Sequence, residues 1–571
     1  MRTLTVRPVN SEGEFLMRES MVGDQAGAVS SARARIDLAT LHEAIAEIKR
    51  EEICLVAGAV RRSWAEVTER TRRIAAVLCE AGLGRRSFDT LQPWESSNDH
   101  LGILLFNGPE YLETLLAAHK ASVAPFNLNY RYTADELAEI LIDAAPEALV
   151  YHAQLAPTLA DALARVKRPR LLLQVADGSG NRLLPGAIDF EVAIAAADPA
   201  TALSPSSPED VHLLYTGGTT GRPKGVIWRI GDLVAGPLGV RDRHGRPLSL
   251  AEAVRRAAGD ASPVLPAPPL MHGAGMWFAL GGWLTGAPVV LLERTQRLDP
   301  AELLDTCERE AVASLLIVGD AFATPLIDEL THKPRDLRLT SIVNSGAPLR
   351  AVLKAQLESL TGARMVDTLG SSETGQQATR SGAGHSTRFQ PRGDVAVLND
   401  AKTAILPAGS DEIGWLAQFG PIPTGYLNDP EKTRKTFVAI AGMQCAVPGD
   451  RARRLADGTI ELLGREATTI NTGGEKVFAE EVEAGVRSIP GVADAVVLGR
   501  PSPRWGQEIV AVVAMAPGAG EVTDEQLRAA CGQHLARYKL PKAFIRVGQV
   551  KRHPNGKADY LWANSIVQEA K

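Results

Sequence analysis

A run of small and hydroxylated residues near the middle of the chain limits the folds that the chain can adopt. Residues 211–215 form a short apolar segment that predicts a buried strand, and the overlapping residues 214–226 read LYTGGTTGRPKGV. Glycine lets backbone N–H groups approach phosphate oxygens closely, threonine adds hydroxyl groups, and Arg222 and Lys224 add positive charge. We therefore expect a nucleotide triphosphate to bind where this strand ends.

This loop is not a Walker phosphate loop. The Walker pattern needs Gly-Lys-Ser/Thr leading into a helix, whereas Lys224 follows Pro223 and precedes Gly225. A flexible Gly/Thr turn without a ligand is the alternative, and the length of the match argues against it. The sequence also lacks a Gly-x-Ser-x-Gly elbow and a Gly-x-Gly-x-x-Gly motif after a strand, which argues against serine hydrolases and dehydrogenases.

Helical and strand-like patterns alternate through the chain. Between about residues 38 and 159, segments of helical period alternate with short apolar segments, and Thr133 with Glu136 predicts a capping box at the start of a helix. This alternation predicts an α/β fold. Short apolar segments rich in β-branched residues predict buried strands at residues 211–215, 314–318, 341–343 and 495–498.

Breaks in these patterns predict the domain organisation. Residues 379–392 are polar and glycine-rich without period, which predicts a surface loop, and a polar, glycine-containing segment at residues 464–474 lies between an apolar strand and a helix from Ala479. About a hundred residues follow, enough for a small domain. The predicted division is a loose N-terminal arm at residues 1–35, a large domain at residues 36–464 and a small domain at residues 465–571.

Composition narrows the classes of function. With 571 residues, of which 45% are hydrophobic, the chain is long enough for two or more domains. The 62 Lys and Arg residues against 67 Asp and Glu residues give a net charge of −5, so the chain lacks the positive surplus of a nucleic-acid coat protein. Its 5 cysteines lie far apart without a Cys-x-x-Cys pair, which favours a reducing compartment over a disulfide framework, a zinc ribbon or an iron–sulfur site.

The sequence shows no targeting or membrane segment. Charged residues are scattered through the first 30 residues, which leaves no apolar core for a signal peptide. Apolar stretches such as residues 103–106 and 288–292 fall well short of the roughly 20 residues that span a bilayer. We therefore expect a cytoplasmic protein.

Several motifs occur in the order found in one family. Residues 214–226 resemble the phosphate-binding signature of the adenylate-forming superfamily, which contains acyl-CoA synthetases, peptide-synthetase adenylation domains and luciferases. Residues 345–349 (SGAPL) resemble its adenine-side loop, and residues 369–375 (LGSSETG) resemble its aromatic-Gly-x-Thr-Glu motif. Residues 449–465 resemble its ribose-binding and hinge region, and residues 552–557 (RHPNGK) resemble the segment with its catalytic lysine. The resemblance covers nearly the whole chain and implies a large adenylation domain of several α/β subdomains, followed by a smaller, mobile α+β domain.

The resemblance implies roles for individual residues. Lys557 would stabilise the charge that develops at the α-phosphate, while Glu373 and the hydroxyl of Thr216 would hold Mg²⁺ against the triphosphate. These three residues form the expected catalytic set. Asp450 would accept hydrogen bonds from the ribose, and Arg465 would donate to the ribose or to a phosphate. The residues expected to bind ATP are Thr216, Gly217, Gly218, Thr219, Thr220, Gly221, Lys224, Gly346, Ala347, Pro348, Leu369, Gly370, Ser371, Ser372, Asp450 and Arg465.

Three positions depart from the family pattern. Leu369 stands where an aromatic ring usually stacks on adenine, and Ser372 stands where threonine is usual. Ala467 stands where the hinge between the domains usually carries Asp or Lys, so the usual charged pivot is missing.

A glycine-rich segment implies the second substrate. Residues 471–477 (NTGGEKV) resemble the loop that CoA ligases of the family bring to the active site, where glycines leave room for the pantetheine arm. The alternative is that Gly473 and Gly474 only form a turn with positive φ ahead of the helix from Ala479. The expected CoA loop comprises Thr472, Gly473, Gly474, Glu475 and Lys476.

The acid side of the site is predicted from residues 268–275 (PPLMHGAG). His272 in this segment resembles the substrate-side histidine or aromatic residue of the family, and we expect it to line the pocket without a catalytic role. A structural histidine with satisfied hydrogen bonds is the alternative. The residues expected to contact the acid are His272, Gly273, Trp277 and Gly319.

The resemblance implies a two-step reaction. A carboxylate attacks the α-phosphate of Mg·ATP to give an acyl-adenylate and pyrophosphate, and a thiol, coenzyme A, then displaces AMP. Residues 227–229 (IWR), 319–321 (GDA) and 446–450 (AVPGD) resemble the branch that activates fatty acids and sterol side-chain acids. The sequence therefore predicts an acid–thiol ligase for a fatty or bulky acid, with ATP and CoA as co-substrates, no nucleic-acid partner and a homodimer.

Other functions stay open from sequence. Family members also pass the activated group to an amine or activate a small oxyacid such as nitrite. A non-catalytic nucleotide-binding relative is a further alternative, against which the intact Lys557, Glu373 and Asp450 argue.

Lys557→Ala tests the lysine assignment. We expect adenylate formation to slow by roughly 10²–10³-fold, the scale for removing one preorganised charge-stabilising donor. Thioester formation from a preformed adenylate should change little, because the lysine faces the phosphates only in the adenylating arrangement of the domains. Pyrophosphate exchange and AMP release, measured separately, check this, and equal damage to both steps would remove the assignment.

Overall fold

A computed structural model describes residues 35–570 apart from residues 88–89, 218–222, 295, 347–348, 350, 382–387, 466–468, 517, 521 and 552–558. Residues 1–34 of the predicted arm lie outside this description. Several predicted site residues also lie outside it, namely Gly218, Thr219, Thr220, Gly221, Ala347, Pro348, Ala467 and Lys557.

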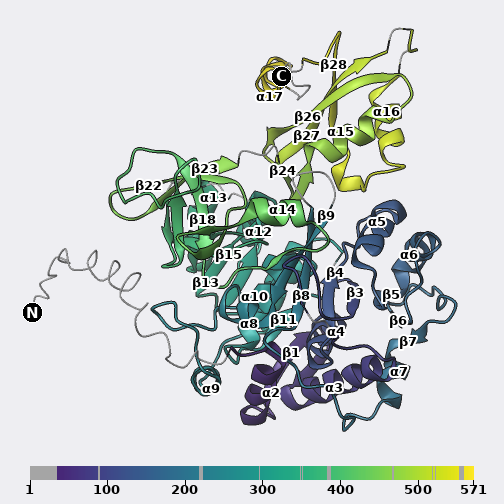
Figure 1. Cartoon of the computed structure of the whole chain (residues 1–571), viewed down its shortest axis with the longest axis vertical. Coiled ribbons are helices and arrows are strands. Elements are labelled where there is room, and N and C mark those ends of the chain that lie inside the picture. Colours follow the sequence, from purple (N-terminus) through teal and green to yellow (C-terminus); the bar gives the residue numbers. More distant parts are fainter. Residues whose placement is uncertain are drawn as a thin grey trace, which may run out of the picture.

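An eight-stranded sheet is formed mainly by the first half of the chain (Figure 1). The six strands β8, β4, β3, β5, β6 and β7 are parallel. Beyond β8, β9 pairs antiparallel with β8, and β19 pairs antiparallel with β9. In order across the sheet, the strands are β19 (Gly425–Tyr426), β9 (Pro223–Arg229), β8 (Val211–Gly217), β4 (Ala124–Asn127), β3 (His100–Leu104), β5 (Ala148–His152), β6 (Leu171–Val175) and β7 (Ile188–Asp189).

A second sheet, of 15 strands in the described part of the chain, completes the large domain. Neighbours from β1 to β14 are parallel, and the remaining pairs are antiparallel. In order, the strands are β2 (Val60–Ser63), β1 (Ile53–Ala57), β11 (Val289–Leu291), β10 (Val264–Pro266), β12 (Ser314–Ile317), β13 (Ser341–Asn344), β14 (Arg364–Ser371), β15 (Gly375–Ser381), β16 (Arg388–Pro391), β23 (Ile460–Arg465), β22 (Asp450–Arg454), β18 (Gly414–Phe419), β21 (Met443–Ala446) and β20 (Phe437–Ile440), and β17 (Val395–Leu398) also pairs with β18.

Helices cover these two sheets and bury their apolar side chains. Thr133 and Glu136 form the predicted capping box at the start of α5, so that prediction is confirmed. The helices of the large domain are α2 (Leu38–Ile48), α3 (Trp64–Glu80), α4 (Pro109–Lys120), α5 (Ala134–Ala144), η2 (Ala153–Leu155), α6 (Ala156–Leu163), α7 (Phe190–Ala196), α8 (Ile230–Ala235), α9 (Leu250–Ala257), α10 (Gly273–Trp283), α11 (Pro300–Arg309), α12 (Gly319–His332), α13 (Ala351–Thr361) and α14 (Pro430–Thr436).

The small domain is an α+β unit with its own core, drawn in yellow and yellow-green at the top of Figure 1. Its sheet has the order β25 (Glu475–Phe478), β24 (Thr469–Thr472), β27 (Gly506–Met515), β26 (Val492–Ser502), with β28 (Ala543–Val547) also beside β27; its helices are α15 (Ala479–Arg487), α16 (Asp524–Cys531), η3 (Arg537–Lys539) and α17 (Tyr560–Glu569). Val497 packs with α15 and α16, while the adjacent Val496 packs with α17. Because successive strand residues point to opposite faces, this sheet buries both faces.

The structure confirms the predicted strands and corrects one loop prediction. Residues 211–215, 314–318, 341–343 and 495–498 coincide with β8, β12, β13 and β26. The surface loop predicted at residues 379–392 is wrong in part, because β15 extends to Ser381 and Arg388–Pro391 forms β16. Within the polar segment that leads to α15, Thr469–Thr472 and Glu475–Phe478 pair as a hairpin.

The reason for the error at residues 379–392 is long-range pairing. The residues of β16 are exposed or half-buried, so they lack the apolar pattern of a buried strand. β16 forms because it pairs with β15 and with β23, which lies far along the chain. β23 ends the large-domain sheet at Arg465, and β24 begins the small-domain sheet at Thr469. None of the described helices combines the length and apolar composition needed to cross a membrane.

Candidate active site

One cavity of about 770 Å³ lies where the carboxyl ends of strands from both large sheets meet. Parallel strands of α/β proteins place their ligand sites at this end, where loops can vary while the strands stay fixed. From the large domain, β4, β8, β10, β12, β13 and β14 lead directly to residues of its wall. The small domain closes one side with Gly473, Gly474, Glu475 and Tyr538.

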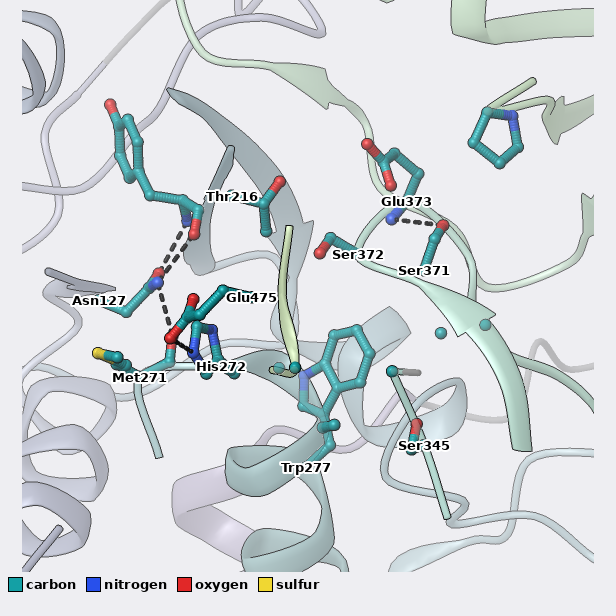
Figure 2. A pocket seen from close by; sticks show the side chains of 18 of the residues that line it. Asn127, Thr216, Met271, His272, Trp277, Ser345, Ser371, Ser372, Glu373 and Glu475 are labelled. Atoms are coloured by element: carbon teal, nitrogen blue, oxygen red, sulfur yellow. Dashed lines mark hydrogen bonds and ion pairs between the residues drawn. The ribbon is translucent and has the colours of Figure 1, made fainter. Parts of the chain in front are cut away.

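The buried amide of Asn127 fixes two parts of this wall relative to each other. Its Nδ2 donates to the carbonyl oxygens of Tyr215 at 2.8 Å and Met271 at 2.7 Å, and its Oδ1 accepts from the Tyr215 N–H at 2.8 Å (Figure 2). Tyr215 directly precedes Thr216, and Met271 directly precedes His272. The predicted phosphate side and the predicted acid side are therefore held together by one side chain.

The β14–β15 turn presents Glu373 to the cavity. The Glu373 N–H donates to Ser371 Oγ over 3.3 Å, and the Tyr426 hydroxyl donates to Glu373 Oε1 over 2.8 Å. From behind, the fully buried Trp228 donates its Nε1–H to the carbonyl oxygen of Ser372 over 2.8 Å. The turn is tight, since a Cβ on Gly370 would lie 2.2 Å from the Gly375 carbonyl oxygen. The backbone of the turn is thus held by Ser371 and Trp228, and Tyr426 holds the carboxylate itself.

Thr216 and Lys224 lie opposite each other on paired strands. They are register partners in the β8–β9 ladder, and Thr216 lines the cavity. The ammonium of Lys224 lies 2.6 Å from Oδ2 of Asp429, which also lines the cavity. Burial raises the pKa of Asp429, but the Lys224 charge and hydrogen bonds outweigh burial and bring this pKa below its ordinary value. Lys224 of the predicted phosphate loop is therefore already paired in this structure.

The predicted adenine and ribose residues form another part of the site. Gly346, with a φ of 80°, lines the cavity together with Leu369, Gly370, Ser371 and Ser372. Leu369 also packs against an apolar cluster of β17, β18, β22 and β23.

The predicted ribose pair lies on two adjacent strands. Asp450 is buried at the start of β22, directly after the cavity residue Gly449, and it is the register partner of Arg465 on β23. The two predicted residues are thus brought opposite each other by strand pairing.

The acid side is lined by three of its four predicted residues. His272 lies at the position just before α10, and Gly273 and Trp277 follow on that helix. The Trp277 ring meets the Trp228 ring edge-on at 6.2 Å between centroids, which joins this wall to the support of the Glu373 turn. Gly319 is not among the residues that line the cavity; it starts α12, and its N–H donates to Asn344 Oδ1 over 2.7 Å.

Glu475 of the predicted CoA loop is held by two side chains of the large domain. Its Oε1 lies 3.2 Å from Nε2 of His272, and it forms an ion pair with Arg131. Burial raises the pKa of Glu475, but the His272 imidazole and the Arg131 guanidinium outweigh burial and hold this pKa at about 2. Glu475 is therefore ionised, and it fixes the loop against the acid side.

The glycines of this loop serve both as a turn and as a close contact. Gly473 and Gly474 have φ values of 58° and 85°, the left-handed region that favours glycine. A Cβ on Gly474 would lie 2.9 Å from Val318 Cγ1, and a Cβ on Gly473 would lie 3.0 Å from the Trp505 ring. Thr472 pairs with Glu475 across the turn, and the backbone of Lys476 pairs with Asn471.

Four residues of the site escaped sequence analysis. Asn127, Arg131, Tyr426 and Asp429 lie outside the recognised motifs. Each bonds to a partner more than 50 residues away along the chain; for example, Arg131 lies 344 positions from Glu475, and Asp429 lies 205 positions from Lys224. A weak local signal exists for Tyr426 and Asp429. The Asp429-Pro430 pair predicts the start of the short helix α14, and Tyr426 lies just before it. For Asn127 and Arg131 we find no local signal.

The described residues fit a cation that arrives with phosphates. Among them, no group of three or more His, Cys, Asp or Glu side chains is arranged to hold a metal ion. Glu373 and Thr216 offer a carboxylate and a hydroxyl on the wall of the same cavity. Mg²⁺ commonly takes one or two protein carboxylates and completes its shell with phosphates and water. The donor set therefore suits Mg²⁺ bound together with a triphosphate.

Comparisons with known proteins agree with these features. Residues 42–416 match the family described as AMP-binding enzyme, and residues 481–557 match the AMP-binding enzyme C-terminal domain. The medium-chain acyl-CoA ligase Mig of Mycobacterium avium is 45% identical over 530 residues, covering 91% of this chain and 96% of that protein. The 3-oxocholest-4-en-26-oate–CoA ligase of Rhodococcus rhodochrous is 33% identical over 92% of this chain and 95% of its own length. The structure of amide bond synthetase McbA from Marinactinospora thermotolerans has a TM-score of 0.74 at 24% identity, covering 93% and 99%, which shows a shared fold.

Glu373→Gln tests the predicted cation site. We expect the Mg²⁺ concentration at half-saturation of ATP binding to rise by roughly tenfold, because one anionic oxygen ligand is lost. The amide can still accept from Tyr426, so the turn should keep its shape. Calorimetric titration of ATP at several Mg²⁺ concentrations measures the midpoint, with Tyr426→Phe as the control that keeps the carboxylate. An unchanged midpoint in the Gln variant would contradict the role of Glu373.

Proposed function

The chain belongs to the AMP-binding enzyme family, and we propose that it is an AMP-forming ligase that joins a medium-chain fatty acid or a bulkier side-chain acid to coenzyme A. The proposed acids follow those in the names of the two relatives that match nearly the full chain. The apolar side chains of Met271, Trp277, Val318 and Phe322 on the cavity wall suit an apolar acyl group.

The proposed reaction has two steps in one cavity. An oxygen of the acid's carboxylate attacks the α-phosphorus of ATP, the bond to the bridging oxygen breaks, and pyrophosphate leaves with that electron pair. The thiol sulfur of CoA then gives up its proton and attacks the carbonyl carbon, and AMP leaves with the electrons of the acyl–phosphate bond. Neither step needs a protein nucleophile, so catalysis depends on positioning and charge stabilisation.

The chain's own residues would position the substrates. Thr216 and the backbone after β8 would bind the phosphates, with Lys224 moving from Asp429 to a phosphate oxygen. Asp450 and Arg465 would hold the ribose, and Lys557 would stabilise the charge at the α-phosphate. Mg²⁺, held by Glu373 and Thr216, would neutralise part of the triphosphate charge.

The observation that carries the proposal is the place of the Gly473–Glu475 turn. It enters the cavity from the small domain and ends at His272 on the acid side. Because Gly473 and Gly474 carry no side chains, the turn lies close against Val318 and Trp505, and neither glycine would obstruct the approach of a pantetheine thiol to the acyl group. This arrangement therefore fits the thioester-forming step. A cytoplasmic location and a homodimer remain predictions from sequence.

A panel of acids tests the function. We expect pyrophosphate release with medium-chain fatty acids or sterol side-chain acids, and formation of the acyl-CoA only when CoA is present. Parallel reactions replace CoA with amines and the acids with nitrite, the alternatives raised by the family. Turnover with an amine but not with CoA, or no acid-dependent pyrophosphate release, would contradict the proposal.

Gly474→Ala tests the role of the turn. We expect thioester formation to slow by roughly tenfold and adenylate formation to change less, because the new Cβ would press on Val318 only when the turn is in the cavity. The double variant Gly474→Ala/Val318→Ala removes Val318 Cγ1, the atom that the new Cβ would contact, and should recover part of the lost rate of thioester formation. Equal loss in both half-reactions without recovery would instead indicate that the glycine serves only the positive φ.

A further inference from the structure

A buried lysine joins the small domain to the large domain. Lys539 in η3 is 3% exposed, and its Nζ lies 2.7 Å from Oε1 of Glu136 and 2.6 Å from Oε1 of Glu481. Glu136 belongs to α5 of the large domain, and Glu481 belongs to α15 of the small domain. One cation thus balances two carboxylates across the domain boundary, and we call these three residues the interdomain lysine cluster.

Aromatic rings surround the cluster. Nζ of Lys539 lies 4.7 Å from the centroid of the Tyr132 ring and 5.7 Å from that of Tyr538, within the range of cation–π attraction. Burial alone would lower the pKa of Lys539, but Tyr132, Glu481 and Glu136 raise this pKa above its ordinary value. Lys539 is therefore charged in this arrangement of the domains.

The large-domain segment that contains Glu136 also holds the turn that enters the cavity. Arg131 pairs with Glu475, and Nδ2 of Asn129 donates to the hydroxyl of Tyr538 over 3.3 Å. Residues 129–136 thus contact both the turn and η3. The interdomain lysine cluster and the placement of the turn therefore form together.

We propose that Lys539 and Glu136 are positioning residues for thioester formation, because their ion pair holds the small domain where the Gly473–Glu475 turn stays in the cavity. The proposal rests on the function proposed above. Lys539 is not among the residues that line the cavity, so it acts through the turn and not on a substrate.

Charge balance explains why this pair selects one arrangement. Lys539 and Glu481 belong to the small domain and move together, whereas Glu136 stays with the large domain. When the domains separate, water can solvate each charge. When they close without the lysine, Glu136 and Glu481 would face each other in a buried place, where burial raises the pKa of Glu481 to about 7 even with Lys539 present. The pair would then either repel or bind a proton, and both costs favour separation.

Glu136 makes a matched substitution available, because its two oxygens have different partners. Oε2 accepts from the N–H of Thr133 at 2.9 Å and from its hydroxyl at 3.1 Å, while Oε1 faces Lys539. Glutamine serves in a capping box as glutamate does. Glu136→Gln therefore keeps the start of α5 and removes the charge that Lys539 meets.

The test compares the two half-reactions in the full-length protein. In Lys539→Met, we expect CoA-dependent AMP release from a preformed adenylate to slow by roughly 10- to 100-fold, because fewer molecules hold the turn in the cavity. Glu136→Gln should act in the same direction. Acid-dependent pyrophosphate exchange should stay within roughly twofold of the parent protein. Lys539→Arg keeps the charge and should recover most of the transfer rate.

Two control variants come from exposed neighbours. Lys542→Met removes a lysine just after η3, and Asp161→Asn removes a carboxylate from α6, both at exposed positions. Both controls should leave the two half-reactions as in the parent protein. A loss in the controls equal to that in Lys539→Met, or parallel loss of both half-reactions in Lys539→Met and Glu136→Gln, would overturn the proposal.

A distance measurement separates this proposal from the proposed function, since it needs no turnover. Spin labels on cysteines introduced at the exposed Asp161 in α6 and Gln568 in α17 report the spacing of the domains. Cys79→Ser serves as background, because the other four native cysteines are buried. We expect Lys539→Met to broaden the distance distribution relative to the parent. An unchanged distribution would overturn the positioning role, even if the parent forms no acyl-CoA and the proposed function fails.

Discussion

The hydrogen bonds of the Asn127 amide set the geometry on which the rest of the site depends. They satisfy three backbone groups at the place where a strand of one large sheet meets the loop that follows a strand of the other. A buried backbone group left unpaired costs roughly 1–3 kcal/mol, so moving either segment alone is unfavourable. Thr216 and His272 each follow a residue bonded to this amide, which keeps phosphate and acid sides in register.

Much of the fold could be predicted from local sequence. The strands β8, β12, β13 and β26 show as short apolar segments, and the helix start at Thr133 shows as a capping box, because each depends on residues close together in the chain. β16 could not be predicted, since its polar residues become a strand only by pairing with β15 and β23. Local patterns report burial and capping, not distant hydrogen-bond partners.

In the site, too, local motifs could be predicted from the sequence and distant partners could not. Thr216, His272, Glu373 and Glu475 lie in contiguous motifs whose glycines and hydroxyls indicate their chemistry, and the structure brings all four to one cavity. Their supporting residues could not be predicted, because Tyr426 meets Glu373 only through the approach of distant segments, and Arg131 meets Glu475 only through the approach of the two domains. Lys557 lies outside the described residues, so its role rests on sequence.

Polar contacts join the two domains, and this has a thermodynamic consequence. Arg131 with Glu475, Lys539 with Glu136, and Asn129 with Tyr538 join the domains through charges and hydrogen bonds. Exposure of apolar surface raises heat capacity and exposure of polar surface lowers it, so exposing these polar groups offsets part of the rise caused by exposing the Tyr132 and Tyr538 rings. The van't Hoff line for the balance between closed and separated domains should therefore curve less than the line for folding itself.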